Sequence, residues 1–176
     1  MAQLKFIFTG TPNVGKTTAI AAISEFEPIT TEVVTTDELA ALKSETTVAM
    51  DYGEVTLEDG TKLRLYGTPG QRRFAFMWEI LAEDALGLIV LVDNSRTDPL
   101  ADLDIYLENF ADLITSAGVV IGVTRSEQHP SPDQDQFYEH VTQKYGQIYP
   151  IFSVDIRKKD DVLLLLDALM ATSEAA

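Results

Sequence analysis

The stretch "FIFTGTPNVGKTTAI", residues 6–20, decides the fold, because it joins an apolar run to a helical pattern through a glycine turn. Its central part, "GTPNVGKT", fits the phosphate-loop pattern G-x-x-x-x-G-K-[ST]. The fixed positions of that pattern are Gly10, Gly15, Lys16 and Thr17. Glycines let successive N–H groups point inward at an anion, and the positive end of the following helix strengthens the attraction. We therefore predict that residues 10–17 bind the phosphates of a nucleotide.

Two side chains of this loop carry most of the expected chemistry. Lys16 supplies a full positive charge toward the β- and γ-phosphates. The hydroxyl of Thr17 can bind Mg²⁺, which prefers oxygen ligands. Pro12 lacks an N–H, so it removes one donor from the loop and stiffens it near the expected γ-phosphate.

The length suits one compact domain, and we expect residues 1–176 to form a single domain. Hydrophobic residues make up 45% of the chain, enough for a substantial core. The absence of cysteine excludes a disulfide framework, a thiolate metal site and a cysteine nucleophile. The formal net charge of −15 repels nucleic acid and anionic lipid, so an anionic ligand needs a local positive pocket.

Targeting signals are not evident in the sequence. The first ten residues lack the charged and apolar regions of a signal peptide, and "VLLLLDALM" near the other end is too short to span a bilayer. Ala2 excludes N-myristoylation, and the final residues carry no prenylation motif. We expect a cytoplasmic protein with no direct membrane anchor and no nucleic-acid partner.

Strand-like and helix-like segments alternate along the chain, which predicts an α/β fold. We expect strands at 4–8, 47–57, 61–67, 86–93, 119–124 and 148–154, and helices at 15–26, 74–84, 101–116, 133–145 and 159–172. Asp59-Gly60 predicts a tight hairpin and hence one antiparallel strand. The prediction is a three-layer P-loop NTPase domain with about six strands, mostly parallel, and helices on both faces.

Residues 27–47 are expected to be irregular, apart from a helical turn near 35–43 where Thr35 and Glu38 have capping-box spacing. Ligands of such sheets bind beyond the carboxyl ends of the strands. The loops at 9–16, 67–73, 124–127 and 153–156 leave strands at that edge, and we expect them to form the site.

With this loop placed, the chain resembles the Ras-like small GTPases along nearly its whole length, and most closely their bacterial gliding-motility polarity and conservon branch. The resemblance implies that Asn13, Val14 and Thr18 also contact the nucleotide. In "ETTVAMDYG", Thr47 is similar to the family's switch I threonine, which binds Mg²⁺ and the γ-phosphate, and Thr46 is the near alternative. The metal ligands implied are therefore Thr17 and Thr47.

The stretch "GTPGQ" (67–71) resembles the family motif D-x-x-G-Q. The resemblance implies that the Gly70 N–H contacts the γ-phosphate and that Gln71 orients the attacking water as the catalytic residue. Gly67 departs from the motif, because the family has an aspartate there that holds Mg²⁺ through water. Arg72 or Arg73 could stabilise transition-state charge, although an exposed arginine on an acidic protein more often pairs with a carboxylate.

Base recognition also departs from the family, whose N-K-x-D motif appears here as "TRSE". The resemblance implies that Thr124, Arg125 and Glu127 contact the base, with the longer Glu127 in the aspartate's role. Ser153 and Val154 stand for the family's S-A-K motif, where a backbone N–H contacts the base oxygen. Guanine is the expected base, with relaxed preference.

The expected function is a GTP-binding molecular switch that hydrolyses GTP to GDP with Mg²⁺, slowly without a regulator. Loss of the γ-phosphate would release residues 27–47 and 70–80. The crowding of Phe74, Phe76, Met77 and Trp78 suits a partner surface, with two of the four expected to be exposed. The resemblance suggests a roadblock-type dimer as the protein regulator.

Two alternatives stay open to different degrees. Gly67 and Pro12 favour a nucleotide-binding scaffold that hydrolyses little. A phosphotransferase acting on a small substrate is disfavoured, because it needs an arginine-bearing lid that this arginine-poor chain does not offer.

Overall fold

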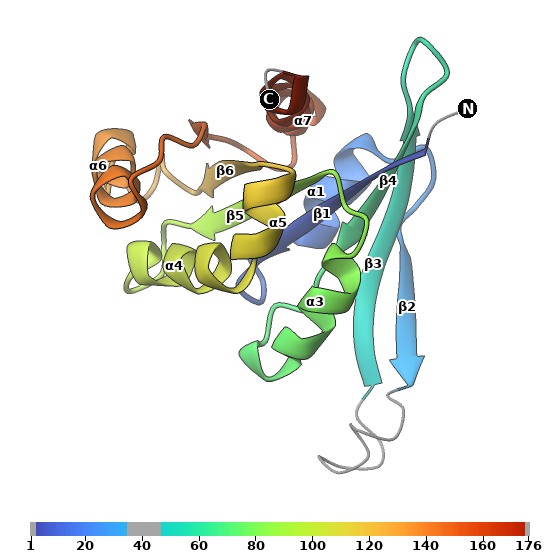
Figure 1. Ribbon diagram of the computed structural model, residues 1–176, viewed down its shortest axis with the longest axis horizontal. Helices are drawn as coiled ribbons and strands as arrows, with labels where there is room; N and C mark the ends of the chain where they lie inside the picture. Colours follow the sequence, from blue (N-terminus) through green and yellow to red (C-terminus); the bar gives the residue numbers. More distant parts are fainter. Residues whose placement is uncertain (1–2, 35–46, 175–176) are drawn as a thin grey trace.

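A seven-stranded sheet with the order β2-β3-β4-β1-β5-β6-β7 forms the centre of the protein. The computed structural model describes residues 3–34 and 47–174 (Figure 1). The strands are β1 (Gln3–Gly10), β2 (Ile29–Val34), β3 (Thr47–Thr56), β4 (Lys62–Gly67), β5 (Gly87–Asp93), β6 (Val119–Thr124) and β7 (Ile151–Ser153). β3 runs antiparallel to β2 and β4, and the other neighbouring strands pair in parallel. The α/β class and the mostly parallel sheet with one antiparallel strand are confirmed.

The strand count was predicted one too low. The additional strand is β2, which lies in the segment expected to be irregular and pairs along its whole length with β3. Its sequence, "ITTEVV", consists mainly of β-branched residues, which fit a pleated strand. The predicted helical turn near 35–43, with Thr35 and Glu38, lies outside the described residues.

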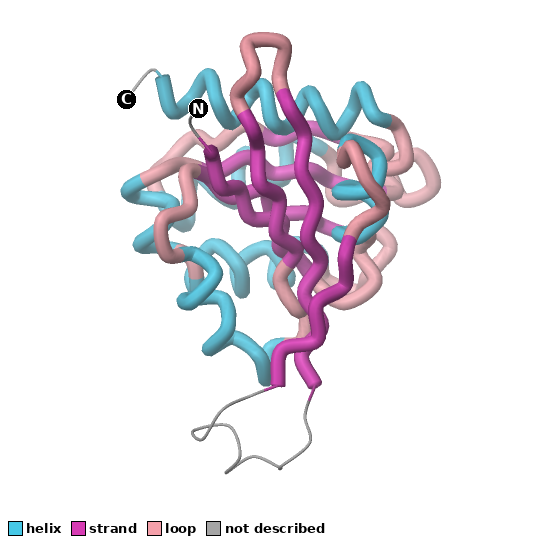
Figure 2. The backbone as a smooth tube through the Cα atoms, turned by 90° about the vertical axis from the view of Figure 1, so that its right-hand side faces the viewer, coloured by secondary structure: helices cyan, strands magenta, loops and turns pink. Residues whose placement is uncertain are grey.

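Helices cover both faces of the sheet, as predicted (Figures 1 and 2). They are α1 (Lys16–Ile23), α3 (Ala75–Ala82), α4 (Pro99–Asn109), α5 (Ala111–Ser116), α6 (Gln134–Tyr145) and α7 (Lys159–Glu174), with a 3-10 turn η1 (Arg72–Phe74) before α3. Side chains from α1 and α7 pack with Phe6 and Phe8 of β1 in one core. Those from α3 to α6 pack with Ile7 in the other. This division follows from the alternation of side chains along a strand.

Two predicted elements have different bounds in the structure. The helix expected at 101–116 is divided into α4 and α5 at Phe110, whose ring stacks on Trp78 with centroids 5.6 Å apart. The strand expected at 148–154 is shortened to β7, which begins at Ile151. The chain enters β7 through Pro150, and Ile148 before it is exposed. Both differences arise from side-chain packing and proline geometry that hydrophobic patterning does not capture.

Register places the expected loops at one edge of the sheet. Phe8 pairs with Gly67, and Gly10 pairs with Leu91 two residues before the end of β5. Asp93 pairs with Thr124, and β7 ends beside β6. The phosphate loop, the loop after β4 and the loops after β6 and β7 therefore leave neighbouring strand ends. Among the helices described, none has the length and apolar character that a bilayer crossing requires.

Candidate functional site

The phosphate loop has the backbone geometry that its glycines predict. Gly10 and Gly15 adopt φ angles of 151° and 109°, and Asn13 adopts 66°. The φ of Gly15 is one that residues with a side chain rarely adopt, and a Cβ there would also lie 2.0 Å from the Cδ1 atom of Ile156. Val14 is fully buried and anchors the loop, while α1 begins directly at Lys16. The predicted strand–loop–helix unit is thus present, with its N–H-rich turn at the edge of the sheet.

Lys16 lies inside this turn and is only 8% exposed. Its ammonium group donates to the carbonyl oxygens of Gly10 at 2.9 Å and of Thr11 at 3.0 Å. Burial lowers the pKa of Lys16 to about 8, and the nearby Asp51 carboxylate opposes that shift. A buried cation at the mouth of an amide-lined loop is suited to an anionic ligand, which would restore the charge balance.

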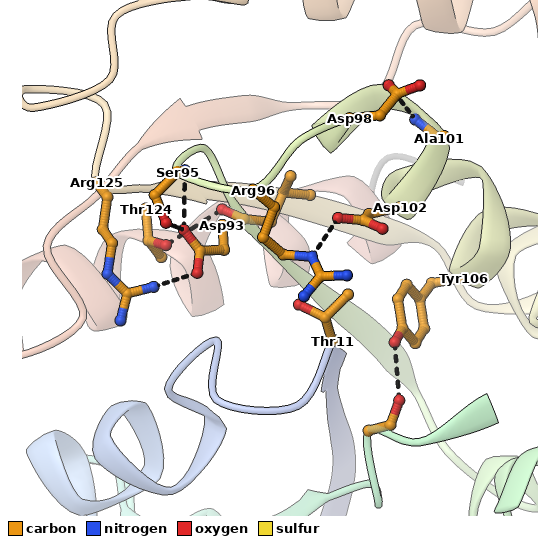
Figure 3. Close-up of polar contacts among 12 residues, drawn as sticks. Thr11, Asp93, Ser95, Arg96, Asp98, Ala101, Asp102, Tyr106, Thr124 and Arg125 are labelled. Atoms are coloured by element: carbon orange, nitrogen blue, oxygen red, sulfur yellow. Dashed lines mark hydrogen bonds and ion pairs between the residues drawn. The ribbon is translucent and has the colours of Figure 1, made fainter. Parts of the chain in front are cut away.

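The loop after β4 packs directly onto the phosphate loop. A Cβ on Gly70 would lie 2.6 Å from the nitrogen of Pro12 and 2.8 Å from the Nζ atom of Lys16, so this contact also requires glycine. The Tyr106 hydroxyl donates to the Gly70 carbonyl at 3.1 Å (Figure 3). The indole N–H of Trp78 donates to the carbonyl of Pro69, the residue before Gly70, at 2.8 Å. Two buried aromatic side chains therefore hold this loop against Lys16.

Gln71, predicted to be catalytic, follows this anchored turn and is exposed. It precedes η1, and its carbonyl accepts the Phe74 N–H at 2.9 Å. Of the two arginines after it, Arg73 lies over the Phe74 ring at 4.7 Å, and Arg72 is exposed. Gln71 therefore directly follows the turn at Gly70, and its catalytic role stays a prediction.

The expectation of two exposed side chains among Phe74, Phe76, Met77 and Trp78 was wrong. Three of them are buried, and Phe76 is half-buried. Phe74 and Met77 form a small cluster with Phe76 and with Met50 of β3, whereas Trp78 packs on Tyr106 of α4 and on Phe110. The exposed apolar residue of this helix is Ile80, which is 59% exposed.

The sequence analysis did not single out Asp51, which the structure brings to the phosphate loop. The Thr17 hydroxyl donates to its Oδ2 atom at 2.5 Å, and the Thr30 hydroxyl donates to its Oδ1 atom at 3.2 Å. A usable signal was present, since an aspartate on the inward-facing side of an alternating strand is unusual. Its contact with Thr17 could not be predicted without knowing the strand pairing.

Thr47, the second expected metal ligand, is the first residue of β3 and pairs with Val34. It lies four residues along the strand from Asp51, a distance of about 13 Å for an extended chain. In this conformation the backbone at 47–50 belongs to the β2–β3 ladder. The metal-binding role of Thr47 stays a prediction, and Thr46 lies outside the described residues.

The loops expected to bind the base lie side by side at the ends of β6 and β7. Thr124 is buried and its hydroxyl donates to the Val92 carbonyl at 3.2 Å. Arg125 has a φ of 60°, and its guanidinium forms an ion pair with Asp93 (Figure 3). Asp93 also accepts hydrogen bonds from the backbone and the hydroxyl of Ser95. The guanidinium of Arg125 is thus directed to the end of β5.

The backbone donor expected near Ser153 and Val154 already has an acceptor. The Val154 N–H donates to the Val123 carbonyl at 2.9 Å, and the next N–H, of Asp155, donates to the Asp161 carboxylate at 2.7 Å. Glu127 is exposed. The loops are brought together as predicted, but contact between the Val154 N–H and a base oxygen would require that bond to Val123 to be exchanged.

Comparison with known proteins identifies a protein family that matches this chain. Residues 26–141, more than half of the chain, match the protein family described as "Conserved hypothetical ATP binding protein". The chain belongs to this family. The matched region begins after the phosphate loop, so residues 10–17 contribute independent evidence for nucleotide binding.

Two curated relatives were found for this family member. An uncharacterized protein of Methanocaldococcus jannaschii is 32% identical over 95 residues, which cover 53% of this chain and 53% of the relative. Intraflagellar transport protein 22 of Chlamydomonas reinhardtii is 26% identical over 109 residues, covering 62% of this chain and 54% of the relative. The alignments thus span about half the length of each relative.

These findings support nucleotide binding and a GTPase-type superfamily. They do not support the bacterial polarity and conservon branch, because the relatives found are archaeal and algal. That part of the expectation is corrected.

Proposed function

We propose that residues 1–176 form one nucleotide-binding G domain that binds GTP with Mg²⁺ and hydrolyses it slowly, acting as a molecular switch. The observation that carries this proposal is the folded phosphate loop with the buried Lys16 ammonium and the Gly70 turn packed against it. Loop and turn meet at the place where the terminal phosphate of a bound nucleotide would lie.

Each residue of the site has a proposed role that follows from its chemistry. The backbone N–H groups of residues 13–18 and the Lys16 ammonium bind the phosphates. The Thr17 hydroxyl is a suitable Mg²⁺ ligand, and bound Mg²⁺ would neutralise phosphate charge. Gln71 orients a water for attack, and the Gly70 N–H binds the terminal phosphate. Thr47 joins the site only if residues 47–50 leave the β2–β3 ladder, which supplies the conformational change of a switch.

Gln71 gives a test of hydrolysis. In a single turnover with Mg²⁺, the variant Gln71→Ala should hydrolyse bound GTP at least about tenfold more slowly than wild type, because alanine cannot orient water. Its affinity for GTP should stay within about twofold, since an exposed side chain contributes little to ground-state binding. The variant Glu79→Ala, at an exposed position on the following helix α3, serves as the control for a nearby surface substitution. Equal hydrolysis rates in wild type and Gln71→Ala would rule out Gln71 as the catalytic residue.

A second candidate function is an adenine-nucleotide binder with little hydrolysis. It is favoured by the family's description and by the Val154 N–H, which already donates to Val123. Glu127 at the aspartate's position favours guanine instead, because a carboxylate accepts hydrogen bonds from the N1–H and amino groups of guanine.

Competition for a bound fluorescent nucleotide separates the two functions. We expect unlabelled GTP and GDP to displace it at concentrations about tenfold lower than ATP and ADP, a difference of about 1.4 kcal/mol. Glu127→Ala should reduce that ratio, while Glu139→Ala, an exposed glutamate on α6, should leave it unchanged. Preference for ATP would select the second function.

A protein regulator or effector remains part of the proposal. A roadblock-type dimer is the partner that the resemblance suggests, and a cytoplasmic location would suit such a switch. Pull-down with a purified roadblock-type protein, comparing GTP- and GDP-loaded chain, tests this point.

A further inference from the structure

Asp51 lies in a row of paired residues that crosses three strands at the edge of the sheet. Thr30 of β2 pairs with Asp51 of β3, and Asp51 pairs with Gly67 of β4. Directly paired residues point to the same face of a sheet. On this face lies α1, whose second residue, Thr17, donates its hydroxyl hydrogen to the Asp51 carboxylate.

Gly67 leaves the space that the Asp51 side chain uses. A Cβ on Gly67 would lie 3.2 Å from the Cβ and 3.3 Å from the Oδ2 atom of Asp51. A carboxylate on β4 would therefore compete for the volume that the β3 carboxylate already fills. The two positions are alternatives for placing one carboxylate beside Thr17.

Another carboxylate at this edge, Asp93, is a poorer candidate for the same role. It lies at the end of β5, where Ser95 and Arg125 donate to its oxygens. Asp51 is instead held by two threonine hydroxyls, which carry no charge. Its negative charge also acts on Lys16, whose pKa it raises against the effect of burial.

In phosphate-loop proteins Mg²⁺ is held by the loop's serine or threonine, by nucleotide phosphates and by a strand-end aspartate. The oxygens of Thr17 and Asp51 are the hard donors that this cation selects. We propose that Asp51, from β3, is the acidic partner of the divalent cation in this chain and replaces the carboxylate that Gly67 cannot supply. This inference rests on the proposed nucleotide binding and adds the residue that makes it cation-dependent.

The test measures GDP affinity by calorimetry, with either excess Mg²⁺ or EDTA. Wild type should bind GDP more tightly with Mg²⁺, and Asp51→Asn should lose about tenfold of that enhancement, as expected when a metal partner is removed. Affinity in EDTA should stay within about twofold, because the phosphate loop is intact. Glu54→Gln is the matched control, since Glu54 lies on the same strand but faces the opposite side and pairs with Lys62.

A second variant exchanges the two residues, Asp51→Gly with Gly67→Asp. It moves the carboxylate from β3 to β4 and removes the tight contact with Asp51 that Gly67→Asp alone would create. We expect the exchange to restore Mg²⁺-enhanced GDP affinity to within about threefold of wild type, whereas Asp51→Gly alone should not. Electron paramagnetic resonance of Mn²⁺ with GDP should show the same order, and circular dichroism checks that each variant folds.

The outcomes separate the two proposals. Full Mg²⁺ enhancement in Asp51→Asn, or a wild type that binds GDP equally well in EDTA, overturns the role of Asp51 and leaves nucleotide binding standing. A wild type that binds no GDP, GTP or ATP overturns the proposed function and this inference together.

Discussion

Replacing Lys16 with alanine should weaken GTP binding by about 100-fold or more, the scale expected when a charge-assisted contact to phosphate is lost from a shielded site. The ammonium group is buried in the amide-lined loop, where it donates hydrogen bonds to the backbone carbonyls of Gly10 and Thr11. A phosphate would add a charged acceptor to it.

The affinity of wild type should also depend on pH. In the free protein the pKa of Lys16 is lowered to about 8, so the lysine is charged below that pH and loses its proton above it. Because phosphate binds the charged form, GTP affinity should fall as pH rises from about 8 to 9.5, and binding should take up a proton in that range. Calorimetry in buffers of different ionisation enthalpy measures this uptake.

The stability of the free protein should change with pH in the opposite direction to its GTP affinity. A lowered pKa in the folded state means that the unfolded chain binds more protons between about pH 8 and 10.5, so Lys16 makes stability rise with pH there. Lys16→Ala lacks this contribution as well as the proton uptake. Lys62→Ala, at a half-buried position on β4, controls for the loss of a charge. Binding of GTP by Lys16→Ala within about threefold of wild type would refute the phosphate-loop assignment.

The second large effect is expected at Trp78, where alanine should lower the free energy of unfolding by about 3–5 kcal/mol. The side chain is 1% exposed and packs on the rings of Tyr106 and Phe110, with centroids 5.0 Å and 5.6 Å away. Truncation would leave a cavity between α3 and α4 and would also free the Pro69 carbonyl.

Urea unfolding followed by circular dichroism measures this loss. Ile80→Ala, on the same helix but exposed, should change stability by less than about 0.5 kcal/mol. Trp78→Phe retains an aromatic ring but no N–H donor, so we expect an intermediate loss of about 1–2 kcal/mol. A loss below about 1 kcal/mol in Trp78→Ala would contradict the packing described for this residue.

The loops expected to bind the base show what sequence motifs could and could not predict. The similarity of "TRSE" and "SVD" to family motifs predicted which loops lie together, and strand register bears out that proximity. The motifs could not predict that the Val154 N–H would donate to Val123, since that bond depends on how β7 docks beside β6. Likewise, the four apolar side chains in residues 74–78 could not reveal how many would be buried, because their burial depends on packing against Met50 of β3 and Tyr106 of α4.

The sequence by itself determined the phosphate loop, the α/β class and the central buried strands. These features are local, because a glycine turn, a lysine at fixed spacing and an apolar run each act within a few residues. Tertiary structure alone decided that Asp51 meets Thr17, a contact 34 residues apart along the chain. Its physical cause is the antiparallel register of β3, which sets Asp51 beside the side-chain-free Gly67 and under the first turn of α1.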